Sequence, residues 1–270
     1  MRVARRNDVV AAAQGFSDAP PPARAACHQP EKRIREPDAT GRIMLWCGAS
    51  TWGECMKPMK VWDLPVRLFH WSIVVLIFAA WLSQELNRME WHVRIGYTIL
   101  TLLLFRLVWG VFGSDTARFL KFVRSPVAAL RHLAHIRRRE PDYEIGHNAA
   151  GGWMVLAMLG LLGVQAGTGL FSNDDANTEG PLMHLVGKEQ SDWLSHIHSL
   201  TFNFIEIFIV LHLLAIAAYA VLKRQNLVRP MVTGTKQMPD DTMAPRMAGT
   251  AWAVLVLALA AGGVAWLVRL

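Results

Sequence analysis

The sequence contains little cysteine, and its three thiols exclude several kinds of metal site. Cys27, Cys47 and Cys55 all precede the first long hydrophobic segment. There is no CxxCH motif for covalent attachment of a c-type haem, and no CxxC pair that would indicate an iron–sulfur cluster or a zinc site. A nucleotide- or flavin-binding glycine motif is also lacking, so we do not expect the chain itself to oxidise NADH. The thiols are best interpreted as incidental residues of a reducing compartment.

Charged side chains are scarce in five long hydrophobic segments. Hydrophobic residues make up 53% of the 270 residues and mean hydropathy is +0.24, although the formal net charge is +7. A helix needs about 20 apolar residues to cross about 30 Å of hydrocarbon. Segments of that length run over residues 66–84, 93–112, 149–171, 201–222 and 250–268. We therefore predict an all-α integral membrane protein with a four-helix bundle and a fifth, C-terminal transmembrane helix. Nothing in this pattern indicates a nucleic-acid partner.

Lysine and arginine are distributed unequally between the loops. They are abundant before the first segment, between the second and third, and after the fourth, whereas Arg88 and Lys188 stand nearly alone in the other two loops. Cytoplasmic loops of membrane proteins carry the excess of these residues. We expect a multi-pass protein of the bacterial inner membrane with a cytoplasmic N-terminus. The 172–197 loop and the C-terminus then lie outside.

Two basic segments outside the membrane carry weaker patterns. Residues 1–55 are rich in Ala, Pro and Arg without periodicity, which indicates a disordered extension or an over-extended gene start. Residues 117–139 contain Ser125-Pro126, a typical helix start, followed by apolar residues at helical spacing. This second segment is either an amphipathic helix on the membrane surface or a solvated basic loop.

Four histidines stand at or inside the ends of the hydrophobic segments: His70, His92, His198 and His212. Ionisable residues are rare inside membranes and usually functional. His198 and His212 are 14 residues apart, so both point to one helix face, about 21 Å apart along the axis. His196 is out of phase with His212 by about 160° and points elsewhere.

The expected depths of the four histidines group them into two pairs. His70 and His212 lie toward the cytoplasmic side, whereas His92 and His198 lie toward the outer side. Each pair offers two imidazoles from different helices, as a six-coordinate haem in a helix bundle requires. We therefore predict two b-type haems stacked across the membrane. Four histidines at two depths cannot share one tetrahedral zinc ion.

Other residues of the hydrophobic segments fit this interpretation. Gly96, one turn after His92, leaves space for a flat macrocycle beside the backbone. Arg106 lies 14 residues after His92 and therefore faces the same way at the depth of the second haem. We expect Arg106, with Arg67 as a second candidate, to pair with a haem propionate. The alternative for both arginines is snorkelling to lipid headgroups.

Several stretches resemble the prokaryotic cytochrome b561 and nickel–iron hydrogenase b-subunit family. They are VWDLPVRLFHW, EWHVRIGY with FRLVWGVFGS, GHNAAGGWMV, the GLFSNDD…EGPL loop and HSLTFNFIEIFIVLH. The resemblance covers about residues 57–235 and implies a four-helix core that binds two b haems. His70, His92, His198 and His212 stand where the family's axial ligands stand. The fifth segment and residues 1–55 depart from the family pattern.

The resemblance leaves several functions open. Our first prediction is electron transfer between the quinone pool and a periplasmic partner such as a c-type cytochrome. The alternatives are a membrane-anchoring cytochrome b subunit of a hydrogenase or dehydrogenase complex, a stand-alone superoxide or quinol oxidoreductase, and a non-redox membrane anchor. We predict no catalytic residue, and a homodimer is left open.

Three other groups of polar residues each have two possible roles. The outer loop contains Asp174, Asp175, Glu179, Glu189 and Asp192 against Lys188, either as a surface for a basic cytochrome c or because basic residues are kept inside. His147 and Asn148 either hydrogen-bond a quinone or cap the third helix. His184 and His196 either relay protons or are inert surface residues.

Overall fold

The computed structural model describes residues 56–134, 142–175 and 178–270, which include all five hydrophobic segments. Five helices are long and apolar enough to cross a membrane: α1 (Leu64–Glu85), α2 (Met89–Phe112), α5 (Ala149–Gly169), α6 (Lys188–Leu222) and α8 (Thr250–Leu267). The prediction of a helical membrane protein with five spans is confirmed. The interpretation of residues 1–55 lies outside the described residues.

Shorter elements lie at the ends of the spans. The helices are α3 (Phe119–Phe122), α4 (Pro126–Ala134) and α7 (Val228–Thr233), and a 3₁₀ turn covers Met183–Leu185. Strand β1 (Met56–Lys60) pairs with β2 (Thr235–Pro239) in antiparallel fashion, with Met56 opposite Pro239 and Lys60 opposite Thr235. This pairing ties the chain before α1 to the chain before α8.

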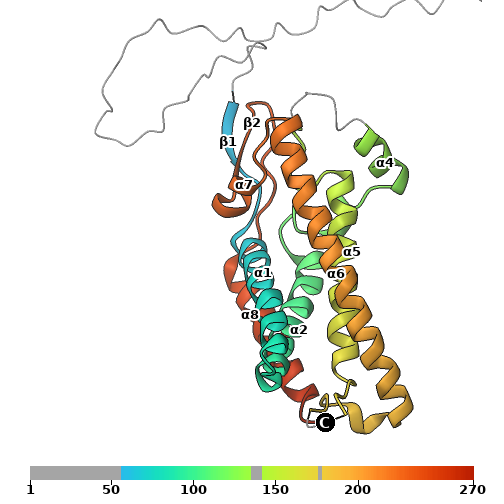
Figure 1. Cartoon of the computed structure of the whole chain (residues 1–270). Helices are drawn as coiled ribbons and strands as arrows, with labels where there is room; N and C mark the ends of the chain where they lie inside the picture. Colours follow the sequence, from blue (N-terminus) through green and yellow to red (C-terminus); the bar gives the residue numbers. More distant parts are fainter. Residues whose placement is uncertain (1–55, 135–141, 176–177) are drawn as a thin grey trace, which may run out of the picture. The chain divides into compact units, whose positions relative to one another are not determined.

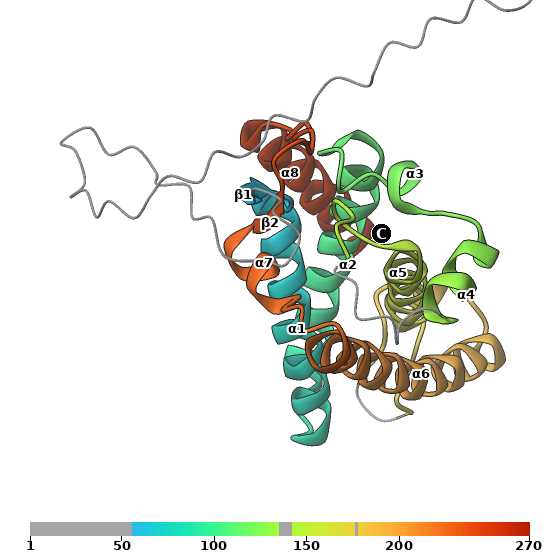
Figure 2. The same cartoon turned by 90° about the horizontal axis from the view of Figure 1, so that it is seen from above.

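The helices within residues 56–270 form two groups (Figures 1 and 2). Helix α2 packs against α1 on one side and α8 on the other, while α5 packs against α6 and α4. Contact between α2 and α5 joins the groups. Figure 1 places the C-terminus at the same end as the turn between α5 and α6, opposite the β1–β2 pair. That is the arrangement an odd number of spans requires.

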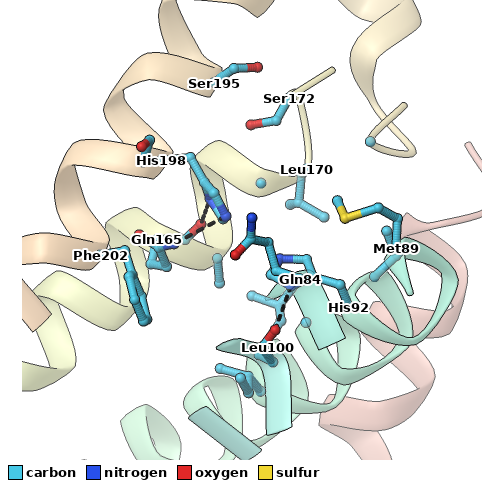
Figure 3. A pocket seen from close by; sticks show the side chains of 18 of the residues that line it. Gln84, Met89, His92, Leu100, Gln165, Leu170, Ser172, Ser195, His198 and Phe202 are labelled. Atoms are coloured by element: carbon cyan, nitrogen blue, oxygen red, sulfur yellow. Dashed lines mark hydrogen bonds between the residues drawn. The ribbon is translucent and has the colours of Figure 1, made fainter. Parts of the chain in front are cut away.

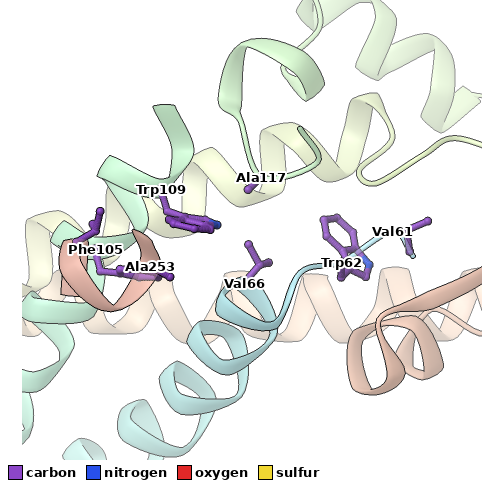
Figure 4. Close-up of a cluster of buried hydrophobic side chains, with 8 residues drawn as sticks. Val61, Trp62, Val66, Phe105, Trp109, Ala117 and Ala253 are labelled. Carbon is purple, nitrogen blue, oxygen red and sulfur yellow. The ribbon is translucent and has the colours of Figure 1, made fainter. Parts of the chain in front are cut away.

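One buried cluster fixes the start of α1 against α2 and α8 (Figure 4). It contains Val61, Trp62, Val66, Phe105, Trp109, Ala117, Ala253 and Val256. Asp63 caps α1 by accepting a hydrogen bond from the Val66 amide at 2.8 Å, and it also accepts one from the Trp109 indole nitrogen at 3.0 Å. Because the carboxylate is buried, both bonds offset the cost of removing it from water. The extra helix α8 thus packs beside a cap that aligns α1 with α2.

A second buried cluster lies halfway along the bundle. Ile73 of α1, Ile99 and Leu103 of α2, Leu162 of α5 and Ile205 of α6 form its centre. Ile205 is seven residues from both His198 and His212, so it lies about 10 Å from each along α6. The middle of the bundle is therefore apolar, with a histidine level on each side.

The structure adds to the sequence prediction in two segments, α6 and α4. Helix α6 begins at Lys188, well before the predicted residue 201, so His198 lies inside the helix. Residues 126–134 form α4, so of the two alternatives the structure has the helix. Val127, Leu130 and Leu133 are exposed on α4 while Ala129 is buried. That division is typical of a helix on a membrane surface.

Candidate functional site

His92 and His198 face each other from α2 and α6. Their ring centres are 6.1 Å apart, and the ring planes make an angle of 75°. Figure 3 shows the two rings entering one pocket from opposite walls. His196, two residues before His198, is exposed.

Backbone carbonyls hold the Nδ1 side of both rings. His92 Nδ1 lies 2.9 Å from the Ala80 carbonyl oxygen, and His198 Nδ1 lies 2.9 Å from the Gln165 carbonyl oxygen. A carbonyl can only accept, so Nδ1 must carry the proton in each neutral ring. Nε2 then carries the lone pair in each ring, which is the state of a metal-binding imidazole.

The pocket between these rings has a volume of about 380 Å³. Its apolar wall includes Ile77, Ile99, Leu162 and Phe202. Gly96 lines it from α2, and a Cβ added there would meet no atom within 4 Å. A flat, largely apolar group can therefore approach the α2 backbone at this glycine. The side-chain amide of Gln165 lies 3.1 Å from His198 Nε2, on the side where a metal ion would bind.

His70 and His212 form the second pair, contributed by α1 and α6. Their ring centres are 6.3 Å apart at an interplanar angle of 54°. His70 also packs edge-on against Trp71, with ring centres 5.0 Å apart. Its Nδ1 is buried without a hydrogen-bond partner among the described residues. The two rings of this pair are thus close together, but no backbone carbonyl of the described residues holds His70 Nδ1.

Both separations fit two imidazoles that bind one metal ion from opposite sides. An imidazole nitrogen binds a metal at about 2.0 Å, so two such rings have centres about 6 Å apart. With one pair at each end of the apolar middle layer, the donors suit two separate haem irons. Within the described residues, no group of three or more His, Cys, Asp or Glu side chains is arranged for another metal ion.

Two arginines accompany the His70–His212 pair. Arg106 is only 2% exposed, its Nη1 is buried without a partner in the described part of the chain, and its guanidinium lies 4.8 Å from the Phe119 ring centre. Arg67 lies one turn before His70 and donates a hydrogen bond to the Val232 carbonyl, while its Nε is buried and unpartnered among the described residues. Such buried donors suit the carboxylates of a haem.

His147 and Asn148 lie at the start of α5, near the second pair. Asn148 caps α5 by accepting a hydrogen bond from the Gly151 amide at 2.8 Å, which agrees with the capping alternative. His147 packs between Trp62 and Phe122, with ring centres 4.6 and 4.7 Å away. Burial of the ring, reinforced by the charge of Arg106, lowers the pKa of His147 to about 3. His147 is therefore neutral at physiological pH.

A polar cluster surrounds the Asn148 side chain. Asn148 donates to the Tyr219 hydroxyl and to Asp142, and His132 lies within hydrogen-bond distance of the same hydroxyl. Lys236 donates to the Asp142 carbonyl at 2.6 Å. The cluster joins α4, α5, α6 and β2 at the end of the bundle beyond His212.

At the other end, the loop between α5 and α6 is held by hydrogen bonds. Asn173 donates to Ser191 and Asp192, and Lys188 forms ion pairs with Asp175 and Asp192. Two of the loop's carboxylates are thus partly compensated within the chain. His184 and His196 are exposed.

Sequence reasoning missed the groups that orient the histidines. Gln165 and Thr168 on α5 contact His198, and the Ala80 carbonyl contacts His92. Backbone carbonyls carry no sequence signal at all. Gln165 is the one amide side chain within the third hydrophobic segment, and that rarity could have identified it.

The chain is similar to known proteins over most of its length. The sequence profile of prokaryotic cytochrome b561 matches residues 61–234. A probable Ni/Fe-hydrogenase B-type cytochrome subunit of Cupriavidus necator is 25% identical over 244 residues, covering 75% of this chain and 96% of the relative. One from Azotobacter chroococcum is 27% identical over 221 residues, covering 67% and 89%. No solved structure gives a significant match.

The profile covers well over half of the chain, including both histidine pairs and all four spans of the bundle. This multi-pass membrane protein therefore belongs to the prokaryotic cytochrome b561 family, whose members are b-type haem proteins of electron transport.

Proposed function

We propose that this chain is the membrane cytochrome b subunit of a hydrogenase or related dehydrogenase complex. It holds two b haems, one between His92 and His198 and one between His70 and His212. With both haems bound, the chain would connect a partner protein at one membrane face to a quinone at the other level of the bundle. Both relatives reported above are named as hydrogenase cytochrome subunits, which favours this alternative over the c-type cytochrome that we put first from the sequence.

The two facing histidine pairs are the observation that carries the proposal. Their ring centres lie 6.1 and 6.3 Å apart, and the histidines on α6 are separated by 14 residues. This separation corresponds to about 21 Å along the helix. Two sites at that spacing within one bilayer provide a path for electrons across it.

Haem supplies reversible one-electron chemistry when it is bound. The chain's own groups then have defined tasks. The Ala80 and Gln165 carbonyls keep Nδ1 of His92 and His198 protonated and direct Nε2 into the pocket. Arg106 and Arg67 provide buried donors for carboxylates at the other level. The apolar layer around Ile99 and Ile205 excludes water between the two levels.

We place the polar end with the β1–β2 pair in the cytoplasm, because the basic loops lie there. The bacterial inner membrane is then the site of the protein, and the α5–α6 turn faces the periplasm. A quinone would be reduced at the membrane boundary near the His70–His212 haem. The Asn148–Tyr219 cluster offers hydrogen-bonding groups at that end.

Transfer to a periplasmic c-type cytochrome is the second candidate. The acidic residues of the α5–α6 turn favour it, because they would attract a basic protein. Lys188 compensates Asp175 and Asp192, however, which reduces that surface charge. This candidate therefore has less support than the hydrogenase partner.

The two candidate functions differ in the redox partner: a hydrogenase in the first and a c-type cytochrome in the second. In native membranes, we expect hydrogen gas to reduce the b-type absorption band of this protein, and a quinone analogue to reoxidise it. Deletion of the chain should abolish hydrogen-dependent quinone reduction while hydrogenase activity with an artificial dye remains. Reduction only through a c-type cytochrome, with no response to hydrogen, would favour the second candidate.

A further inference from the structure

The two histidine pairs have different electrostatic surroundings, and the difference bears on the direction of electron flow. Both pairs are haem ligands under the proposed function, on which this inference rests. Two properties tune the potential of a haem: hydrogen bonds to its axial imidazoles and charges buried nearby.

The first difference between the two pairs is in the hydrogen bonds to their imidazole rings. Both rings of the His92–His198 pair have Nδ1 at 2.9 Å from a backbone carbonyl. His198 Nδ1 additionally lies 3.3 Å from the Thr168 hydroxyl. Donation from Nδ1–H makes Nε2 a stronger donor to iron, and a stronger donor stabilises the oxidised iron. In the described part of the chain, the Nδ1 atom of His70 is buried and has no hydrogen-bond partner.

The second difference is a buried positive charge near the His70–His212 pair, which favours a higher potential there. Arg106 on α2 and His212 on α6 each lie 14 residues beyond the facing residues His92 and His198. Helices α2 and α6 both run away from that pair, so Arg106 reaches the depth of His212. Ring contacts also connect Arg106 to His147 at this end of the bundle: the Arg106 guanidinium lies 4.8 Å from the Phe119 ring centre, and Phe122 lies 5.8 Å from Phe119 and 4.7 Å from His147.

Within the described residues, no carboxylate forms a contact ion pair with Arg106, so its charge is available to a haem propionate at the His70–His212 level. Asp63 is close enough to interact with it electrostatically, but Arg106 Nη1 is buried without a hydrogen-bond partner among the described residues. Asp63 instead accepts bonds from the Val66 amide and the Trp109 indole. By contrast, no lysine or arginine of the described residues lines the pocket between His92 and His198. A buried cation stabilises the more electron-rich, reduced haem.

We infer that the haem between His70 and His212 has the higher midpoint potential and the haem between His92 and His198 the lower one. Electrons entering at the His92–His198 level then move favourably to the His70–His212 level. One iron is oxidised and the other reduced, and no bond or proton changes. In the proposed orientation this direction is from the periplasmic face toward the cytoplasmic face, where the proposed quinone site lies.

Potentiometric titration of the purified full-length protein tests the assignment. The haem bands should resolve into two components. In Arg106→Gln the higher-potential component should shift to lower potential while the other stays in place, and Arg106→Lys should shift it less. Arg94→Gln is the matched control, because Arg94 is exposed and paired with Glu90 near His92. It should move neither component.

Single-haem variants give a second, independent assignment. His198→Ala should leave one haem that titrates near the higher component, and His212→Ala one that titrates near the lower. The reverse order, or a shift of the lower component in Arg106→Gln, would overturn the inference. Failure of the proposed function would be distinguishable, because hydrogen gas would then not reduce the b-type band in native membranes, whereas the order of the two components and their response to Arg106→Gln would be unchanged.

Discussion

Gly169 lies against the His198 ring so closely that a Cβ added at residue 169 would be 3.0 Å from the imidazole Cε1. The glycine stands at the end of α5, and the ring crosses to it from α6. The absence of a side chain at residue 169 therefore allows His198 to occupy its place beside the Gln165 carbonyl.

Gly169→Ala should consequently disturb the His92–His198 haem. A methyl group would push the ring by a few tenths of an ångström and weaken its alignment with Gln165 and Thr168. We expect reduced occupancy or a shifted potential for one haem component, measured by haem content and redox titration. The matched control is Gly160→Ala in the same helix, where the new Cβ would meet nothing within 4 Å. Equal behaviour of the two variants would contradict the steric argument.

The Asp63 carboxylate should contribute strongly to stability. Asp63→Ala removes the cap of α1, which costs about 0.5–2 kcal/mol. It also leaves the buried Trp109 indole N–H unpaired, at a further cost of about 1–3 kcal/mol. We expect a clearly lower thermal midpoint in detergent.

Asp240→Ala provides the comparison for Asp63. Its carboxylate is mostly exposed and lies 3.7 Å from Lys57, so its loss should change the free energy of unfolding by less than about 1 kcal/mol. Similar thermal midpoints for the two alanine variants would show that the Asp63 contacts add little stability.

The Asp142 cluster should make stability depend on pH in the acid range. Burial raises the pKa of the Asp142 carboxyl, but hydrogen bonds from the Glu144 amide and Asn148 and the charge of Lys236 outweigh it and hold the pKa below its ordinary value. A carboxyl with a depressed folded-state pKa stabilises the fold above the unfolded value of about 3.9, and this contribution is lost as pH falls through the folded-state pKa.

In Asp142→Asn, the thermal midpoint should therefore fall less steeply with decreasing pH below about pH 4 than in the wild-type protein. Thermal unfolding followed across that range in detergent measures the slope for both proteins. If the wild-type and variant slopes coincide, the carboxylate is not responsible for acid sensitivity at this end of the bundle.

Much of the helical core was predictable from the sequence because membrane burial imposes a simple pattern. Unbroken apolar runs such as 250–268 have few alternatives to a spanning helix. The phase of His198 and His212 follows from helix geometry alone, and in the structure both face a histidine of another helix. Regular spacing within one helix thus carried most of the information about the candidate site.

The features that were not predicted depend on contacts between distant segments. Strands β1 and β2 lack alternating hydrophobicity, and their pairing joins Met56 to Pro239. The first turns of α6 are polar, so the hydrophobic pattern starts late, although Ser191 is buried and bonds to Phe171 and Asn173. Likewise, the carbonyls of Ala80 and Gln165 find their histidines only in the folded chain.

The pairing of the four histidines is tested most directly by haem content in single and double alanine variants. The wild-type protein should bind two haems per chain, measured by the pyridine haemochrome assay on purified protein, and each single variant should bind one. His70→Ala combined with His212→Ala should still bind one, because both residues serve the same haem, whereas His70→Ala combined with His198→Ala should bind none. Equal haem content in these two double variants would contradict the pairing.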